Sequence, residues 1–183
     1  DVNAIWDLTT HDFSIFNYLL DATPLSVSAS GCKALDGNVE DTTFTSFKYK
    51  GDILAHAHAS WLNPLKVRKM TIVGEKKMLI WDDIDLDRPI QIFDSNISIE
   101  ETFTDSFSSH RSVYHRGDIL IPNVRTGEPL KEELSHFIDC LLDDAKELKS
   151  GGRFSSNIVN VLEASDVSLR ENGRFVDVEY PCR

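Results

Sequence analysis

The chain has 183 residues, of which 41% are hydrophobic and 27% are charged, and its formal net charge is −11. This length and apolar content suit a single domain with one core, while the negative charge disfavours a nucleic-acid or anionic-membrane partner. The three cysteines are widely spaced and form no C-x-x-C pair, which favours unpaired thiols in the reducing cytoplasm over a disulfide framework or a zinc site.

The first helix is expected to begin near His11, with Thr9 or Thr10 at its N-cap, and to end at residues 21–24, Asp-Ala-Thr-Pro. Its apolar face would consist of Ile15, Phe16 and Leu19. Alternating and β-branched residues then predict six strands, at Leu25–Ser30, Thr42–Lys48, Ile53–Leu62, Lys69–Val73, Lys77–Trp81 and Ile90–Phe93. Residues 49–52 and 74–76 are typical of hairpin turns.

Two further helices are predicted towards the C-terminus. One begins at Glu128-Pro129, and its apolar stripe contains Leu130, Leu134, Phe137, Ile138, Leu141 and Leu142. The other runs from about Ser155 to Glu171 and stops at Asn172-Gly173, with Ile158, Val161, Leu162 and Leu169 on one face. The polar, serine-rich segment Ile97–Arg116 is interpreted as a long surface loop.

Helices at the two ends of a strand-rich chain predict an α+β fold, in which a mainly antiparallel sheet has its helices on one face. The strand Ile53–Leu62 alternates between two rows, and both contain apolar residues. We therefore expect both faces of the sheet to be covered, one by helices and the other by a second subunit.

Asp7 and His11, in the run DLTTHD, form the sharpest candidate site. A histidine in the first turn of a helix meets the positive end of the helix dipole, which favours a neutral imidazole. Such a ring can accept a proton from a substrate hydroxyl, while Asp7 could hold its tautomer and stabilise the imidazolium. Alcohol oxidation requires this proton transfer. By spacing alone, a D-x-x-x-H match at the start of a helix is more often an incidental surface pair.

Other polar residues carry weaker signals. His56 and His58 have a spacing that can bind a metal, but no third ligand is indicated, so packing or an interface is favoured and no metal is expected. Core packing is the default role for Trp61. Arg116 suits recognition of a phosphate or carboxylate, although residue type alone favours a turn with solvated charges.

The sequence lacks two phosphate-binding patterns. It contains neither G-x-G-x-x-G nor G-x-x-x-x-G-K-[ST]. No amino-acid side chain accepts a hydride, so oxidoreductase chemistry would require a cofactor that this chain cannot hold unaided.

Five segments in register resemble the C-terminal domain of the glucose–fructose oxidoreductase, inositol dehydrogenase and rhizopine-catabolism (Gfo/Idh/MocA) family. The first, DLTTHDFSIFNYLL, is similar to the D-x-x-x-H-D helix that opens that domain. The second, ILAHAHASWLNPLKVRKMTIVGEKKMLIWDD, is similar to the family's sheet segment. The others are YHRGDILIP, EPLKEELSHFIDCLL and NIVNVLEASDVSLRENGR.

The resemblance implies a two-domain enzyme whose N-terminal Rossmann domain binds NAD or NADP and supplies a lysine from a Glu-Lys-Pro motif. Neither is present here, so the chain, which does not open with methionine, is expected to be the single C-terminal substrate-binding domain of a longer protein. That domain is a large, open, mostly antiparallel sheet, as in glyceraldehyde-3-phosphate dehydrogenase. Asp7 and His11 match the family's active-site pair, and His11 is the one residue expected near the nicotinamide. Ser14 stands where many relatives have a substrate-facing acid.

The implied substrates of the complete enzyme are sugars, polyols or nucleotide sugars. The segments containing Arg116 and Glu128 lean towards nucleotide-linked amino sugars. The family also associates through its open sheet, so a homodimer or homotetramer is expected. Two alternatives remain: a stand-alone sheet domain that dimerises or binds sugar, and a metal-dependent sugar-binding or hydrolytic domain that uses His56 and His58.

Overall fold

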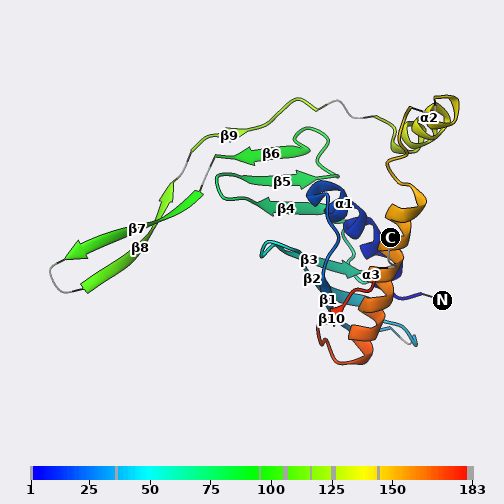
Figure 1. Ribbon diagram of the computed structural model, residues 1–183, viewed down its shortest axis with the longest axis horizontal. Coiled ribbons are helices and arrows are strands. Elements are labelled where there is room, and N and C mark those ends of the chain that lie inside the picture. Colours follow the sequence, from blue (N-terminus) through cyan, green and yellow to red (C-terminus); the bar gives the residue numbers. More distant parts are fainter. Residues whose placement is uncertain are drawn as a thin grey trace. The chain divides into compact units, whose positions relative to one another are not determined.

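The protein is described by a computed structural model (Figure 1). The structure describes residues 2–35, 37–94, 96–104, 107–115, 117–124, 127–143 and 145–180.

The described chain contains helices and ten strands in the order η1 (Ile5–Thr9), α1 (Thr10–Leu20), β1 (Ser26–Cys32), β2 (Thr42–Lys48), β3 (Leu54–Ser60), β4 (Lys69–Val73), β5 (Met78–Asp82), β6 (Ile90–Phe93), β7 (Asn96–Thr104), β8 (Phe107–His115), β9 (Ile119–Leu120), α2 (Pro129–Leu142), α3 (Gly152–Arg170) and β10 (Val176–Asp177). It divides into two compact units, one of residues 1–64 with 135–183 and the other of residues 65–134. The α+β class is confirmed, and the six predicted strands are present with small shifts at their ends.

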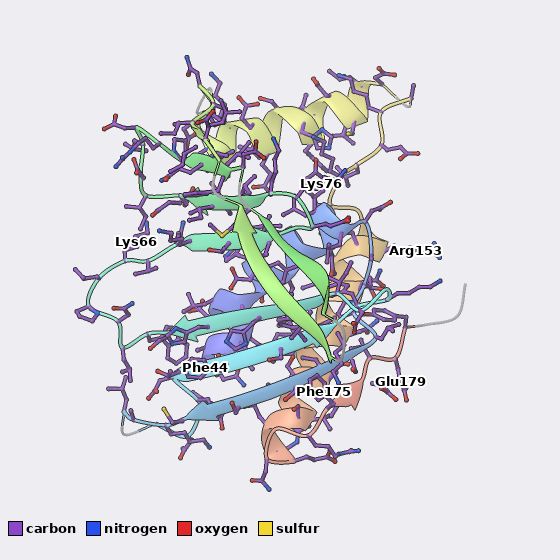
Figure 2. The ribbon with its side chains drawn as sticks, turned by 90° about the vertical axis from the view of Figure 1, so that its left-hand side faces the viewer. Phe44, Lys66, Lys76, Arg153, Phe175 and Glu179 are labelled. Atoms are coloured by element: carbon purple, nitrogen blue, oxygen red, sulfur yellow. The ribbon has the colours of Figure 1, made fainter. Side chains whose placement is uncertain are left out.

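The first unit is a four-stranded antiparallel sheet in the order β10-β1-β2-β3. Figure 2 shows α1 and α3 behind these strands, so the helices of this unit cover one face of the sheet. The core between the layers contains Val27, Ala29, Phe47 and Ala57 from the sheet and Ile158, Val161 and Leu162 from α3. The expectation of helices on one face is therefore correct for this unit.

Helix α3 is also joined to the sheet by hydrogen bonds. The Ser168 hydroxyl accepts a bond from the Ala29 N–H at 2.8 Å and donates to the Arg174 carbonyl at 2.6 Å. The chain then reverses at Asn172 (φ 55°) and Gly173 (φ 82°), a left-handed pair typical of a helix C-terminus. The predicted stop at these two residues is correct.

The outer row of β3 is open in the single chain. Ala57 and Ala59 pack towards the helices, whereas Leu54, His56 and His58 point to the opposite side and are exposed. Among the described residues of the first unit, none covers this outer row.

The hydrogen bonds at the two ends of β3 show which of its residues bond to β2. The Trp61 N–H donates to the Asp41 carbonyl, and the Tyr49 N–H donates to the Ile53 carbonyl, both at 2.9 Å. Because bonded and non-bonded pairs alternate in an antiparallel ladder, the odd-numbered residues of β3 bond to β2. The even-numbered residues direct their N–H and C=O groups away from it, at the edge of the sheet.

The second unit contains an antiparallel sheet in the order β4-β5-β6-β9 and a separate hairpin, β7–β8. The hairpin pairs Asn96 with His115 and continues in register to Thr104 and Phe107. The prediction of a long loop over 97–116 is therefore wrong. Strand stability depends on cross-strand pairing, which the serine-rich composition of the segment did not reveal.

The first helix also differs from its prediction. Helical structure begins at Ile5, six residues before His11. The residues most buried along it are Ile5, Thr9 and Phe13, whereas Leu19 is 52% exposed. The expected apolar face was therefore misplaced: Ile15 and Phe16 lie at its margin, and Leu19 lies outside it.

Helix α2 has the predicted start at Pro129, but the six apolar residues of its stripe are all exposed. None of the helices in the described ranges is long and apolar enough to cross a membrane.

Candidate functional site

The helical segment that carries the candidate site begins with one wide turn. In η1 the Thr10 N–H bonds to the carbonyl of Ile5, an i→i+5 contact, before regular α-helix begins. The Thr10 hydroxyl also donates to the Trp6 carbonyl at 2.6 Å. Single π-type turns of this kind occur often at functional sites. His11 therefore lies in the second helical turn, so the expected effect of the helix N-terminus on it loses its structural basis.

Asp7, His11 and Ser14 share one face of this segment, because their spacing is i, i+4, i+7. His11 follows the buried Thr9 by two residues, which is a rotation of about 200° around a helix of 3.6 residues per turn. Asp7 and His11 are accordingly exposed, and Ser14 is half-buried. The three predicted site residues of the helix thus form a stripe opposite the core face.

Asp7 makes one long-range contact. Its Oδ2 accepts a hydrogen bond from Nε1 of Trp61 at 2.8 Å, across 54 residues of sequence. Trp61 is 39% exposed, so the expectation of simple core packing does not describe it. Sequence reasoning missed this contact, since nothing local to either residue indicates it.

Within the described part of the chain, no hydrogen bond or ion pair joins Asp7 to His11. Residues four apart on a helix have Cβ atoms about 5–6 Å apart, so the pair remains within one side-chain rotation of contact. The tautomer role assigned to Asp7 stays a prediction.

Asp12 is a further acid at this site that the sequence reasoning did not select. Burial raises the pKa of its carboxyl, and the neighbouring charge of His11 opposes that rise more weakly. A half-buried carboxyl beside the candidate proton acceptor is the type of group found at functional sites. The local signal was its place directly after His11 in the run DLTTHD.

Arg116, the predicted anion-binding residue, lies outside the described residues. The backbone beyond it is anchored to β6, because the Asp94 N–H donates to the Asp118 carbonyl at 3.0 Å.

His56 and His58 lie on the outer face of β3 with an aromatic neighbour. The Phe44 ring stacks on His58 at 4.4 Å and 3°, and its centroid is 6.1 Å from that of His56. The Ser46 hydroxyl lies 3.2 Å from Nδ1 of His56. Across the ranges that the structure describes, no three His, Cys, Asp or Glu side chains gather as a metal-binding set. His56 and His58 thus pack beside Phe44 on an exposed face of the sheet.

A groove of about 570 Å³ lies in the first unit, away from the predicted residues. Its polar lining includes Asn3, Trp6, Lys33 and Asp166. The Asp166 carboxylate is bound at both oxygens, by Nδ2 of Asn3 and by Nε1 of Trp6, each at 2.8 Å. Neither Asp7 nor His11 lines this groove. The groove is therefore not assigned to the proton transfer, despite its size.

Comparison with known proteins gives a family match over part of the chain and a shared fold. The sequence pattern of the GFO/IDH/MocA C-terminal domain matches residues 2–80. No curated protein matches this chain in sequence.

Several solved structures share the fold. UDP-N-acetylglucosamine 3-dehydrogenase from Acidithiobacillus ferrooxidans has a TM-score of 0.70 at 18% identity, over 93% of this chain and 50% of its own. The WlbA dehydrogenase from Bordetella pertussis, in complex with NADH and UDP-GlcNAcA, has a TM-score of 0.67 at 16% identity, over 98% and 46%. Levoglucosan dehydrogenase, in complex with NADH and levoglucosan, has a TM-score of 0.70 at 16% identity, over 98% and 51%.

At these identities the likeness concerns the fold, and the chain spans about half the length of each of these structures. The resemblance inferred from the sequence is confirmed over residues 2–80, which match the GFO/IDH/MocA C-terminal domain, and the chain has the α+β fold of the similar solved structures.

Proposed function

We propose that this chain is the substrate-binding part of an NAD(P)-dependent dehydrogenase that acts on a sugar, polyol or nucleotide sugar. The observation that carries the proposal is the stripe of Asp7, His11 and Ser14, which faces away from the core on a helix that matches the family pattern. A stripe of polar residues on a helix whose opposite face packs in the core is rigid enough to orient a substrate.

The proposed chemistry of this stripe is proton transfer. The His11 imidazole would accept the proton of the substrate hydroxyl as the hydride leaves the carbon that bears this hydroxyl. Asp7 would stabilise the imidazolium that forms, because an adjacent carboxylate favours the charged ring. Ser14 would donate a hydrogen bond to a second hydroxyl of the sugar or accept one from it.

The cofactor of this proposal is NAD or NADP, which would take up the hydride. The chain contains no glycine-rich loop of the type that cradles a pyrophosphate. Its own residues fit only the nicotinamide end, near His11. The remaining contacts would come from a Rossmann domain outside this chain.

The substrate class rests on the relatives. Two of the similar structures are named for, or were solved with, a UDP-linked amino sugar or its acid derivative, and a third was solved with levoglucosan. Arg116 would recognise a phosphate or carboxylate of such a substrate. Replacing it with alanine in the complete enzyme should raise the substrate KM and leave the fold intact.

Mutation of His11 in the complete enzyme tests the proposed function. His11→Ala should lower kcat by about 10²–10⁴-fold, the usual contribution of general acid–base catalysis, and leave cofactor affinity unchanged. His136→Ala is a matched control, because the described contacts of His136 are with Cys140 and Lys149. Turnover at the wild-type level in His11→Ala would assign the proton transfer to another group.

We also propose that the outer face of the first sheet is the surface of self-association. Phe44 and Leu54 are exposed on it, and the Lys48 ammonium lies 3.9 Å from the centroid of the Phe175 ring. Figure 2 views this face, with Phe44 and Phe175 labelled. If two copies paired through this face about a two-fold axis, the face of each copy would be buried in one interface.

A stand-alone sheet domain is the competing function, and the same exposed face favours it. An assay of the complete protein for NAD(P)+-dependent oxidation and NAD(P)H-dependent reduction of sugars separates the two. Activity that requires His11 supports the dehydrogenase, whereas association without any turnover supports the sheet domain.

A further inference from the structure

Two tryptophan–carboxylate pairs occur in the first unit, and they differ in one respect. In each, an indole N–H donates to an aspartate oxygen at 2.8 Å: Trp6 to Asp166, and Trp61 to Asp7. Hydrogen bonds to an ionised acceptor are about twice as strong as those between neutral groups. Both pairs also join distant parts of the sequence, so they fix tertiary structure.

The difference lies in the second oxygen of each carboxylate. At Asp166 it accepts a bond from Asn3, so that carboxylate is fully engaged by the fold. At Asp7 only Oδ2 is engaged, and Oδ1 has no hydrogen-bond partner among the residues that the structure describes. The free oxygen belongs to the residue that lies one turn before His11.

The indole that holds Asp7 is itself anchored. The backbone N–H of Trp61 donates to the carbonyl of Asp41 at 2.9 Å. Ser60, the last residue of β3, pairs its hydroxyl with that of Thr42 at 2.7 Å and accepts the Leu62 N–H at 3.1 Å. The Trp61 side chain has only two torsions, and its backbone is held by hydrogen bonds at the end of the strand. Its indole N–H is therefore a rigid donor.

We propose that Trp61 is a positioning residue for Asp7. By occupying Oδ2, the indole restricts the rotation of the carboxylate and keeps Oδ1 for the His11 side of the helix. An exposed aspartate without this contact would sample several rotamers and lose side-chain entropy whenever it met His11. Trp61 removes part of that loss in advance, which is preorganisation. The consequence for turnover rests on the proposed function, but the contact itself does not.

Nitrogen-15 NMR of the 183-residue chain provides the first test. If Asp7 acts on His11 as proposed, its Oδ1 accepts a hydrogen bond from Nδ1–H of the ring, so the nitrogens of neutral His11 in the wild type should report a dominant Nδ1–H tautomer. Trp61→Phe and Asp7→Asn should both move the His11 shifts towards the Nε2–H tautomer. Trp6→Phe is the matched control: it removes an indole bonded to Asp166 and should leave His11 unchanged.

The indole N–H signals give an independent readout of the contact. Asp7→Ala should move the Trp61 signal upfield and speed its exchange with water, while Asp166→Ala should do so for Trp6 alone. If Trp61→Phe leaves the His11 nitrogens at their wild-type shifts, Trp61 does not position Asp7. If Asp7→Asn also leaves them unchanged, Asp7 does not act on the ring, and the inference is wrong for that reason as well.

Kinetics of the complete enzyme supply the second test. Trp61→Phe should lower kcat by about tenfold to a hundredfold, since small misplacements of a reacting group have effects of this size. The KM for the cofactor should not change. An unchanged kcat would show the contact to be structural only. If the wild type has no dehydrogenase activity while the His11 tautomer still depends on Trp61, the proposed function fails and the positioning of Asp7 stands.

Discussion

The rotation of the first helix decides which residues face the substrate, and a pair of truncations measures it. Phe13 is 1% exposed and meets the Phe47 ring edge-on at 4.5 Å and 77°. Phe13→Ala should therefore lower the free energy of unfolding by about 3–5 kcal/mol, which includes an aromatic pair of about 0.5–1.5 kcal/mol. Leu19 is 52% exposed. Half of the burial energy of a leucine is roughly 1 kcal/mol, the upper limit for Leu19→Ala.

Urea unfolding followed by far-UV circular dichroism gives both values for the 183-residue chain, provided that the slope of stability against urea is the same in each variant. The result expected from local periodicity is the reverse, since that pattern puts Leu19 in the core. A cost for Leu19→Ala equal to or above that for Phe13→Ala would mean that the helix is turned the other way. In that case Asp7, His11 and Ser14 would not share the outward face.

Four further results are expected from the chain itself. In amide hydrogen exchange, odd-numbered residues of β3 should be protected and even-numbered residues should exchange fast, because only the odd ones bond to β2; uniform protection would mean that another strand pairs at this edge. Asp12→Asn should stabilise the protein at neutral pH. Burial raises the pKa of the Asp12 carboxyl above 3.8, so its contribution to stability is fully present below that pH and is lost as pH rises through the folded-state pKa. Asp139→Asn should have the opposite effect at neutral pH, because hydrogen bonding to Lys146 lowers the pKa of Asp139; equal signs in urea unfolding would contradict the assignment. Finally, Phe44→Ser should weaken self-association in light scattering and leave the circular dichroism spectrum unchanged, whereas a monomeric wild type would remove the outer face as an interface.

Local patterns were sufficient where the residue types of a segment match the structure that the segment adopts. Strands β2, β4 and β6 have the predicted bounds, because their β-branched and aromatic residues fit a half-buried pleated surface. Helix α2 starts at Pro129 as expected, since a proline at the first helical position sacrifices no intrahelical hydrogen bond. The end of α3 was predicted correctly from Asn172 and Gly173, which adopt positive φ at little cost.

The sequence by itself determined the fold class, most of the strands, and the candidate pair Asp7 and His11. Only the tertiary structure decided that Asp7 is held by Trp61, that Phe13 and not Leu19 faces the core, and that β7 pairs with β8. The physical reason is the range of the interactions involved. Propensity and periodicity act over a few residues, whereas the bond from Trp61 to Asp7 spans 54 residues and forms only after β3 and the first helix are packed into one unit.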